Sequence, residues 1–391
     1  MPFCKAKCTY CNFASGVFGA ERMGQYVERV CAEIAAARGA AAGMGAELPT
    51  RVDTIFLGGG TPSLLTGEQM RRLFIAVRDQ FDVASDAEVT LECAPGQLSE
   101  ETLEEMLRTG MNRISFGVQS FVDAEAKAVG RLHTRAMCLE EIERMRAAGL
   151  REINVDLIVG LPGQTAASWR ESVVMAIASG VPHLSLYMLE VDEDSRLGRE
   201  MIKAREGAAD GLAARFGAAS VPKEDETAEW YGAACGWLEA AGVRQYEISN
   251  FAQEGHASRH NVKYWRRQPY VGFGLDAHSM LCTNAGAVRW ANTSNLEDYL
   301  TRDAAGPEVD LICREQAFEE AMFLGLRMNE GVDLAALRME FGEDLVTGAV
   351  DALQVVQEAG LVVVEGARVK LTAEGRMASN EVFGRLLVAV A

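Results

Sequence analysis

The sequence is short of positive charge and of long apolar runs. Against 56 Asp and Glu residues it has only 38 Lys and Arg, which gives a formal net charge of −18 over 391 residues. A chain this acidic repels phosphate backbones, so a nucleic-acid partner is not expected. No uninterrupted apolar stretch approaches the ~18 residues that a membrane helix needs. The opening residues already carry Cys and Lys where the apolar core of a leader would lie, so we expect no signal peptide and a cytoplasmic protein.

Proline is scarce as well, with 9 residues, and the 38 glycines follow no fibrous repeat. Hydrophobic residues make up 49% and charged residues 24%, which is the composition of an ordinary globular chain. These values exclude wholesale disorder and a collagen-like fibre. The length is sufficient for two or three domains.

Three of the nine cysteines crowd together near the start, in the pattern Cys4-x3-Cys8-x2-Cys11. In a reducing compartment such a group indicates a metal or cluster site, whereas the six scattered cysteines are expected to be core thiols. Three thiolates on one loop can hold three irons of a 4Fe–4S cube and leave the fourth iron open. Zinc remains the alternative, but it needs a fourth Cys or His nearby, and Asn12 and Phe13 come next.

From residue 51 onward, short β-like runs alternate with amphipathic helical stretches. We expect strands over 52–57, 88–92, 113–116, 152–159 and 183–189, and helices over 67–81, 99–109, 134–148 and 165–179. This rhythm predicts an α/β protein with a parallel, barrel-like sheet covered by helices. Functional residues in such folds gather at the carboxyl ends of the strands.

Unusual residues do fall at these strand ends. Gly58–Ser63 follow the first strand, Glu92 ends the second, Gln119 follows the third and Asp156 lies within the fourth. Adjacent glycines let a ligand approach the backbone, although a plain turn would also use them. The two carboxylates are either site residues or satisfied polar groups of the core. Arg131 is either a surface charge or a clamp for a ligand carboxylate.

Three later regions bear on function or on domain organisation. The segment His260–Trp265 sets an imidazole beside aromatic rings, which suits a metalloporphyrin and suits a packed loop equally well. Residues 199–229 are rich in alanine, glycine and charge, and we expect a helical insertion there. The tail is expected to form helices over 314–327, 333–341 and 344–359, a hairpin over 361–372 and a last helix from 373, an arrangement like a winged helix. The third of these helices lacks Lys and Arg, so the tail is expected to pack rather than to read DNA.

Several motifs together resemble the HemW family of heme chaperones, in the radical S-adenosylmethionine (SAM) superfamily and related to the oxygen-independent coproporphyrinogen III oxidases. They are residues 2–13, 58–63, 117–121, 154–158, 160–164 and 260–265. The resemblance implies a partial (β/α)6 TIM-like radical SAM barrel with the cluster loop over 1–198. It further implies an insertion and extension with the His260 motif over 199–310, and a winged-helix-like α+β domain over 311–391. In the family a strand precedes the cysteine loop, but only three residues precede Cys4 here, so we expect five barrel strands and either an upstream start or a truncated chain.

The resemblance also implies the ligands. A 4Fe–4S cluster would be held by Cys4, Cys8 and Cys11, heme would be handled by His260, and SAM would contact Gly59, Gly60, Thr61, Glu92, Gln119, Arg131 and Asp156. Clients would be hemoproteins such as respiratory enzymes, with an electron donor and a homodimer also implied.

The branch of the superfamily depends on two positions. The oxidases have a fourth cysteine where this chain has Phe13, and the His260–Trp265 motif marks the chaperones. Both features favour heme delivery. The alternative is a coproporphyrinogen III oxidase, an enzyme of porphyrin biosynthesis, and a radical SAM enzyme with an unrelated substrate is a third reading. Whether the protein is an enzyme is left open by the sequence.

Overall fold

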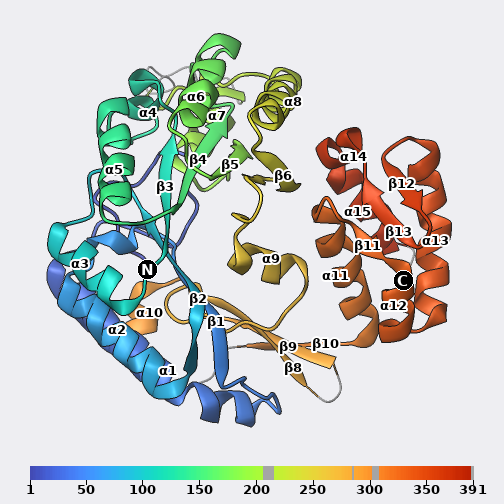
Figure 1. The fold of residues 1–391 in the computed structure, drawn as a ribbon, viewed down its shortest axis with the longest axis horizontal. Coiled ribbons are helices and arrows are strands. Elements are labelled where there is room, and N and C mark those ends of the chain that lie inside the picture. Colours follow the sequence, from blue (N-terminus) through green and yellow to red (C-terminus); the bar gives the residue numbers. More distant parts are fainter. Residues whose placement is uncertain (206–214, 284–285, 302–307, 389–391) are drawn as a thin grey trace.

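A curled, mostly parallel sheet forms the body of the computed structural model, which describes residues 1–205, 215–283, 286–301 and 308–388 (Figure 1). Five parallel strands lie side by side in chain order: β1 (Arg51–Leu57), β2 (Asp82–Cys93), β3 (Arg113–Gln119), β4 (Glu152–Val159) and β5 (His183–Met188). The expected α/β half-barrel with five parallel strands is confirmed. Beyond β5 the sheet continues with two antiparallel strands that the pattern did not predict, β7 (Asn250–Ala252) and β6 (Arg244–Glu247).

Helices cover the outer face of this sheet (Figure 1). Four of them match their predicted bounds to within one residue: α2 (Gly67–Gln80), α3 (Glu100–Thr109), α5 (Arg135–Ala147) and α6 (Ala166–Ala178). The first residues of these helices could be predicted because each helix has a threonine or serine N-cap. The cap side chain accepts a hydrogen bond from the backbone N–H three residues on in each case: Thr66, Ser99, Thr134 and Thr165. The long α1 (Ala20–Gly43) and the short α4 (Asp123–Ala128) were not predicted.

The middle of the chain adds an extension to the barrel. It comprises α7 (Arg196–Arg205), a short 3-10 turn (Ala218–Ser220), α8 (Glu224–Ala240), α9 (Arg259–Trp265), β8 (His278–Thr283), β9 (Gly286–Ala291), α10 (Leu296–Thr301) and β10 (Val309–Ile312). The helical insertion expected over 199–229 is present as the end of α7 and the start of α8, while residues 206–214 lie outside the described residues. Strands β8, β9 and β10 form a second, antiparallel sheet, which the sequence pattern missed.

The tail forms the expected helices and hairpin. Its elements are α11 (Arg314–Arg327), β11 (Val332–Asp333), α12 (Leu334–Phe341), α13 (Glu343–Glu358), β12 (Val362–Glu365), β13 (Arg368–Leu371), α14 (Ala373–Met377) and α15 (Ser379–Val388). The small antiparallel sheet has the order β11-β13-β12, and the single last helix that was expected is divided at Ala378. Among the described residues, no helix is long and apolar enough to cross a bilayer.

Candidate functional site

One large cavity, of about 610 Å³, lies at the carboxyl ends of the parallel strands. It brings together every residue that the sequence predicted for the cluster and for SAM, although these residues are spread over more than 150 positions. The lining includes Cys4, Cys8, Cys11, Gly59, Gly60, Thr61, Glu92, Gln119, Arg131 and Asp156. His260 does not line this cavity.

The cysteine loop presents its sulfurs to positive and hydroxyl donors. Arg131 Nη1 donates to Cys8 Sγ at 3.4 Å, and Thr61 Oγ1 donates to Cys4 Sγ at 3.8 Å. Such donors favour the thiolate form that binds metal. In the described part of the chain, no three His, Cys, Asp or Glu side chains come together closely enough to hold a single metal ion. The loop thus places the three cysteines on the wall of one cavity.

The glycine turn is required by the close approach of the cysteine loop. A Cβ on Gly60 would lie 2.8 Å from Phe3 O and 3.0 Å from Cys4 Sγ. Gly60 N and Thr61 N donate to the carbonyls of Met1 and Phe3, at 2.6 and 2.7 Å. Gly59, at φ 106°, also adopts a conformation that side chains disfavour. These glycines therefore do more than turn the chain, because the cluster loop docks directly on them.

Two carboxylates form the acidic floor of the cavity. Glu92 Oε2 accepts from Gly59 N at 2.9 Å, and Asp156 accepts from Asn154 Nδ2 at 2.7 Å and from Ser115 Oγ at 3.2 Å. Burial, together with the neighbouring charge of Asp156, raises the pKa of Glu92 to about 7. Burial also raises the pKa of Asp156. A positively charged ligand group would relieve both effects.

Gln119 and Arg131 leave buried polar atoms without partners. Gln119 has φ 69° at a bulge in β3, and its Oε1 has no hydrogen-bond partner among the described residues. Arg131 donates to Gly117 O and Cys8 Sγ, yet its buried Nε has no partner in the same part of the chain. Buried polar atoms are normally paired, and a polar ligand in the cavity would supply partners for both. Arg131 is therefore not a solvated surface charge.

His260 lies in α9, where its side chain contacts β1. Its Nδ1 is 3.0 Å from Thr54 Oγ1, and its Nε2 is 3.0 Å from Tyr264 Oη. Its ring stacks on Phe56. Burial lowers the pKa of His260 to about 4, so the imidazole is neutral near pH 7. In this conformation each ring nitrogen of His260 has a hydroxyl as its hydrogen-bond partner.

Residues far along the chain complete the wall of the large cavity, and no sequence pattern predicted them. Tyr187 and Met188 come from the end of β5, and Arg327 and Met377 come from α11 and α14. Only the folded arrangement of barrel and tail brings these residues together. The tail thus contributes directly to the site.

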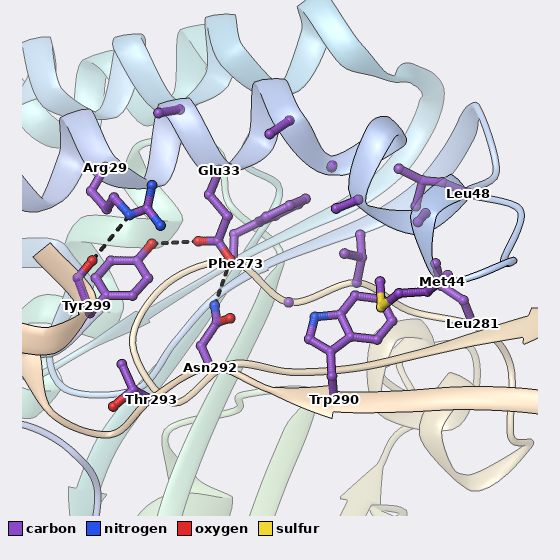
Figure 2. Close-up of a pocket in the computed structure, with 17 residues that line it drawn as sticks. Arg29, Glu33, Met44, Leu48, Phe273, Leu281, Trp290, Asn292, Thr293 and Tyr299 are labelled. Atoms are coloured by element: carbon purple, nitrogen blue, oxygen red, sulfur yellow. Dashed lines mark hydrogen bonds between the residues drawn. The ribbon is translucent and has the colours of Figure 1, made fainter. Parts of the chain in front are cut away.

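A second cavity, of about 290 Å³, lies between α1 and the β8–β9 sheet (Figure 2). At one end Glu33 accepts from Tyr299 Oη at 2.5 Å, from Asn292 Nδ2 at 2.6 Å and from Gly274 N at 3.0 Å. Both carboxylate oxygens are thus engaged by the protein itself. This partly buried group of hydrogen bonds connects α1 to the segments that flank the second sheet.

The comparisons with known proteins agree with this geometry. Residues 1–176 match the Radical SAM superfamily, and residues 312–378 match the HemN C-terminal domain. The coproporphyrinogen III oxidase HemN from Escherichia coli has a similar fold, with a TM-score of 0.81 at 22% identity over 99% of this chain and 88% of that one. The half-barrel and its cysteine loop are those of a radical SAM protein.

Similar proteins of known name identify the family within the radical SAM superfamily. Heme chaperone HemW of Bacillus subtilis is 33% identical over 392 residues, covering 99% of this chain and 97% of that protein. Heme chaperone HemW of Escherichia coli is 32% identical over 321 residues, covering 82% and 79%. The chain belongs to the HemW family.

Proposed function

We propose that this protein binds heme and delivers it to client hemoproteins, with a 4Fe–4S cluster on Cys4, Cys8 and Cys11 and an exchangeable SAM beside it. The observation that carries the proposal is the similarity to curated heme chaperones over 99% of the chain. The shared cavity supports it, because thiols and candidate SAM contacts line the same space.

Each part of the cavity suits one part of SAM. The acidic floor of Glu92 and Asp156 suits an ammonium group and ribose hydroxyls, and the Arg131 guanidinium suits a carboxylate. The unpaired Gln119 Oε1 would accept from a donor of the ligand. When bound, a reduced cluster supplies an electron for SAM cleavage, and the protein's part is to hold and orient both groups.

His260 is our candidate for heme handling. A neutral imidazole is the form that binds iron, and burial keeps His260 in that form. Because Nε2 is bonded to Tyr264 Oη, that hydrogen bond must break before iron can bind there. We therefore expect α9 to move or repack when heme binds at this residue.

Phe13 separates the chaperone from the oxidase reading. The side chain lines the cavity and is 60% exposed, at the position where the oxidases have a fourth cysteine. A phenyl ring there supplies apolar surface for a flat ligand and cannot ligate metal. The proposal also includes an electron donor for the cluster and a homodimer.

One sample can test the function. The protein is reconstituted anaerobically with iron and sulfide, titrated with heme, and then assayed with coproporphyrinogen III and SAM. We expect a Soret band that saturates with heme, a shift of that band in His260→Ala, transfer of heme to an apo-hemoprotein and no decarboxylation. Turnover of coproporphyrinogen III would make the protein an oxidase, and absence of a saturable Soret band would refute the chaperone proposal.

A further inference from the structure

A chain of hydrogen bonds crosses the interior of the half-barrel, from α9 to the acidic floor of the large cavity. Ser258 N, at the start of α9, donates to Tyr246 Oη at 3.3 Å, and Tyr246 Oη is 2.9 Å from His183 Nε2. His183 Nδ1 is 2.6 Å from Asn154 Oδ1, and Asn154 Nδ2 donates to Asp156 Oδ1 at 2.7 Å. The chain thus joins the helix that carries His260 to a candidate SAM contact.

The partners fix the direction of every bond. Asn154 Oδ1 can only accept, so His183 carries its proton on Nδ1, and its Nε2 must accept from the Tyr246 hydroxyl. Burial, with the charge of Arg113 nearby, holds the pKa of His183 well below its ordinary value, which keeps the imidazole neutral, and the acceptor Asn154 Oδ1 then selects this tautomer. All donors therefore point toward Asp156, and bonds aligned in this way strengthen one another.

The start of α9 is also fixed from a second side. Glu88, a buried residue of β2, accepts from Ser258 Oγ, Arg259 N and His260 N at 3.2, 3.0 and 2.8 Å. The buried Arg113 lies 3.7 Å from Glu88 and donates to His256 O. In Figure 1, α9 lies across the open side of the sheet, between the barrel and α11. Because Glu88 and Tyr246 both hold the first turn of this short helix, a displacement of either side chain would move α9 as a whole.

We propose that Asn154, His183 and Tyr246 form a relay that couples occupancy of the SAM pocket at Asp156 to the position of α9. They are positioning residues, since within the described residues none of them lines the large cavity. The relay rests on the proposed function only for the identity of the ligand at Asp156. By thermodynamic reciprocity, a ligand that orders Asp156 stabilises α9, and a ligand that moves α9 changes the affinity at Asp156.

The test uses the full chain with its reconstituted cluster. SAM affinity is measured by equilibrium dialysis, and amide hydrogen exchange over residues 258–266 is followed with and without SAM. We expect SAM to slow this exchange in the unchanged protein. Tyr246→Phe keeps the ring and removes the hydroxyl, so it should abolish the slowing and weaken SAM binding about 5-fold to 10-fold.

Matched variants separate the relay from general destabilisation. Tyr299→Phe removes another buried hydroxyl, the one bonded to Glu33, and should behave as the unchanged protein does. His183→Leu should match Tyr246→Phe, whereas His183→Gln retains a donor and an acceptor and should recover part of the effect. If SAM leaves the exchange of α9 unaltered, or if Tyr246→Phe responds as Tyr299→Phe does, the relay is wrong.

The outcomes for relay and function are distinct. SAM-dependent slowing in α9 without any heme binding would support the relay and refute the chaperone proposal. Saturable heme binding without any response of α9 to SAM would refute the relay and leave the chaperone proposal intact.

Discussion

The imidazole of His260 lies flat against the ring of Phe56, with ring centroids 4.9 Å apart and an interplanar angle of 16°. Phe56 belongs to β1, and Gly58 follows it by two residues at the start of the glycine turn. The stacked pair thus connects the motif of α9 with the strand that positions the cluster loop. His260 is thus a structural contact of the barrel as well as our candidate for heme handling.

Tyr264→Phe tests whether heme iron competes for His260. The substitution removes the hydroxyl bonded to Nε2, and a hydrogen bond of this kind is worth about 0.5–1.5 kcal/mol. Heme affinity, measured by Soret titration, should therefore rise by roughly 2-fold to 10-fold. Thr54→Val is the matched control, because it removes the partner of Nδ1 instead. Equal or lower affinity in Tyr264→Phe would argue against iron binding at Nε2.

Cys8→Ser tests the cluster. Iron content after anaerobic reconstitution should fall from about four atoms per chain to near zero, with loss of the brown colour. Cys282→Ser, at an exposed thiol in β8, should retain iron and colour. Colourless unchanged protein containing zinc would contradict the cluster assignment.

The pH dependence of stability follows from Glu92. Its folded pKa, about 7, lies above the ordinary value near 4.5, so the stability it contributes is complete below pH 4.5 and is lost as pH rises through 7. The metal-free protein should therefore lose about 1 kcal/mol of unfolding free energy between pH 6 and pH 8. Urea denaturation of Glu92→Gln should show a flatter profile. Glu104→Gln, on the exposed face of α3, should retain the original slope.

Arg113→Met should be strongly destabilising. The guanidinium lies 3.7 Å from Glu88 and 3.2 Å from Glu152, and removing it leaves a buried carboxylate unpaired beneath α9. Breaking a buried pair of this kind costs about 3–5 kcal/mol. The measurement is the shift in urea midpoint, with the exposed Arg71→Met as control, for which little change is expected. A shift no larger than that of the control would show that Glu88 holds α9 without its charge partner.

The candidate site could be predicted largely because its residues follow strands. Once strands are placed in a parallel sheet, their carboxyl ends must converge, so Glu92, Gln119 and Asp156 meet without further information. Glu88 and His183 escaped prediction for the opposite reason. Their partners, Ser258 and Tyr246, lie far along the chain, and no local sequence pattern predicts such a contact.

Some helices and strands were not predicted correctly, for reasons that lie in their own residues. Helix α1 buries Tyr26, Val27, Val30 and Ile34 along one face, but its many alanines weaken the contrast between its two faces. Strand β2 begins at Asp82, six residues earlier than predicted, because the polar segment pairs with the start of β1 beyond a register shift. Strands β6 to β10 are only three to six residues long, which is too short for their alternation of polar and apolar residues to stand out.

The wall of the large cavity is shared by the cysteine loop and by Arg376, Met377 and Asn380 near the far end of the polypeptide. A ligand that fills the cavity would contact both the cysteine loop and the tail. We therefore expect the tail to be held more firmly against the barrel when the cavity is filled. Protease cleavage next to the exposed Cys313, between β10 and the first helix of the tail, should accordingly be slower in the loaded state.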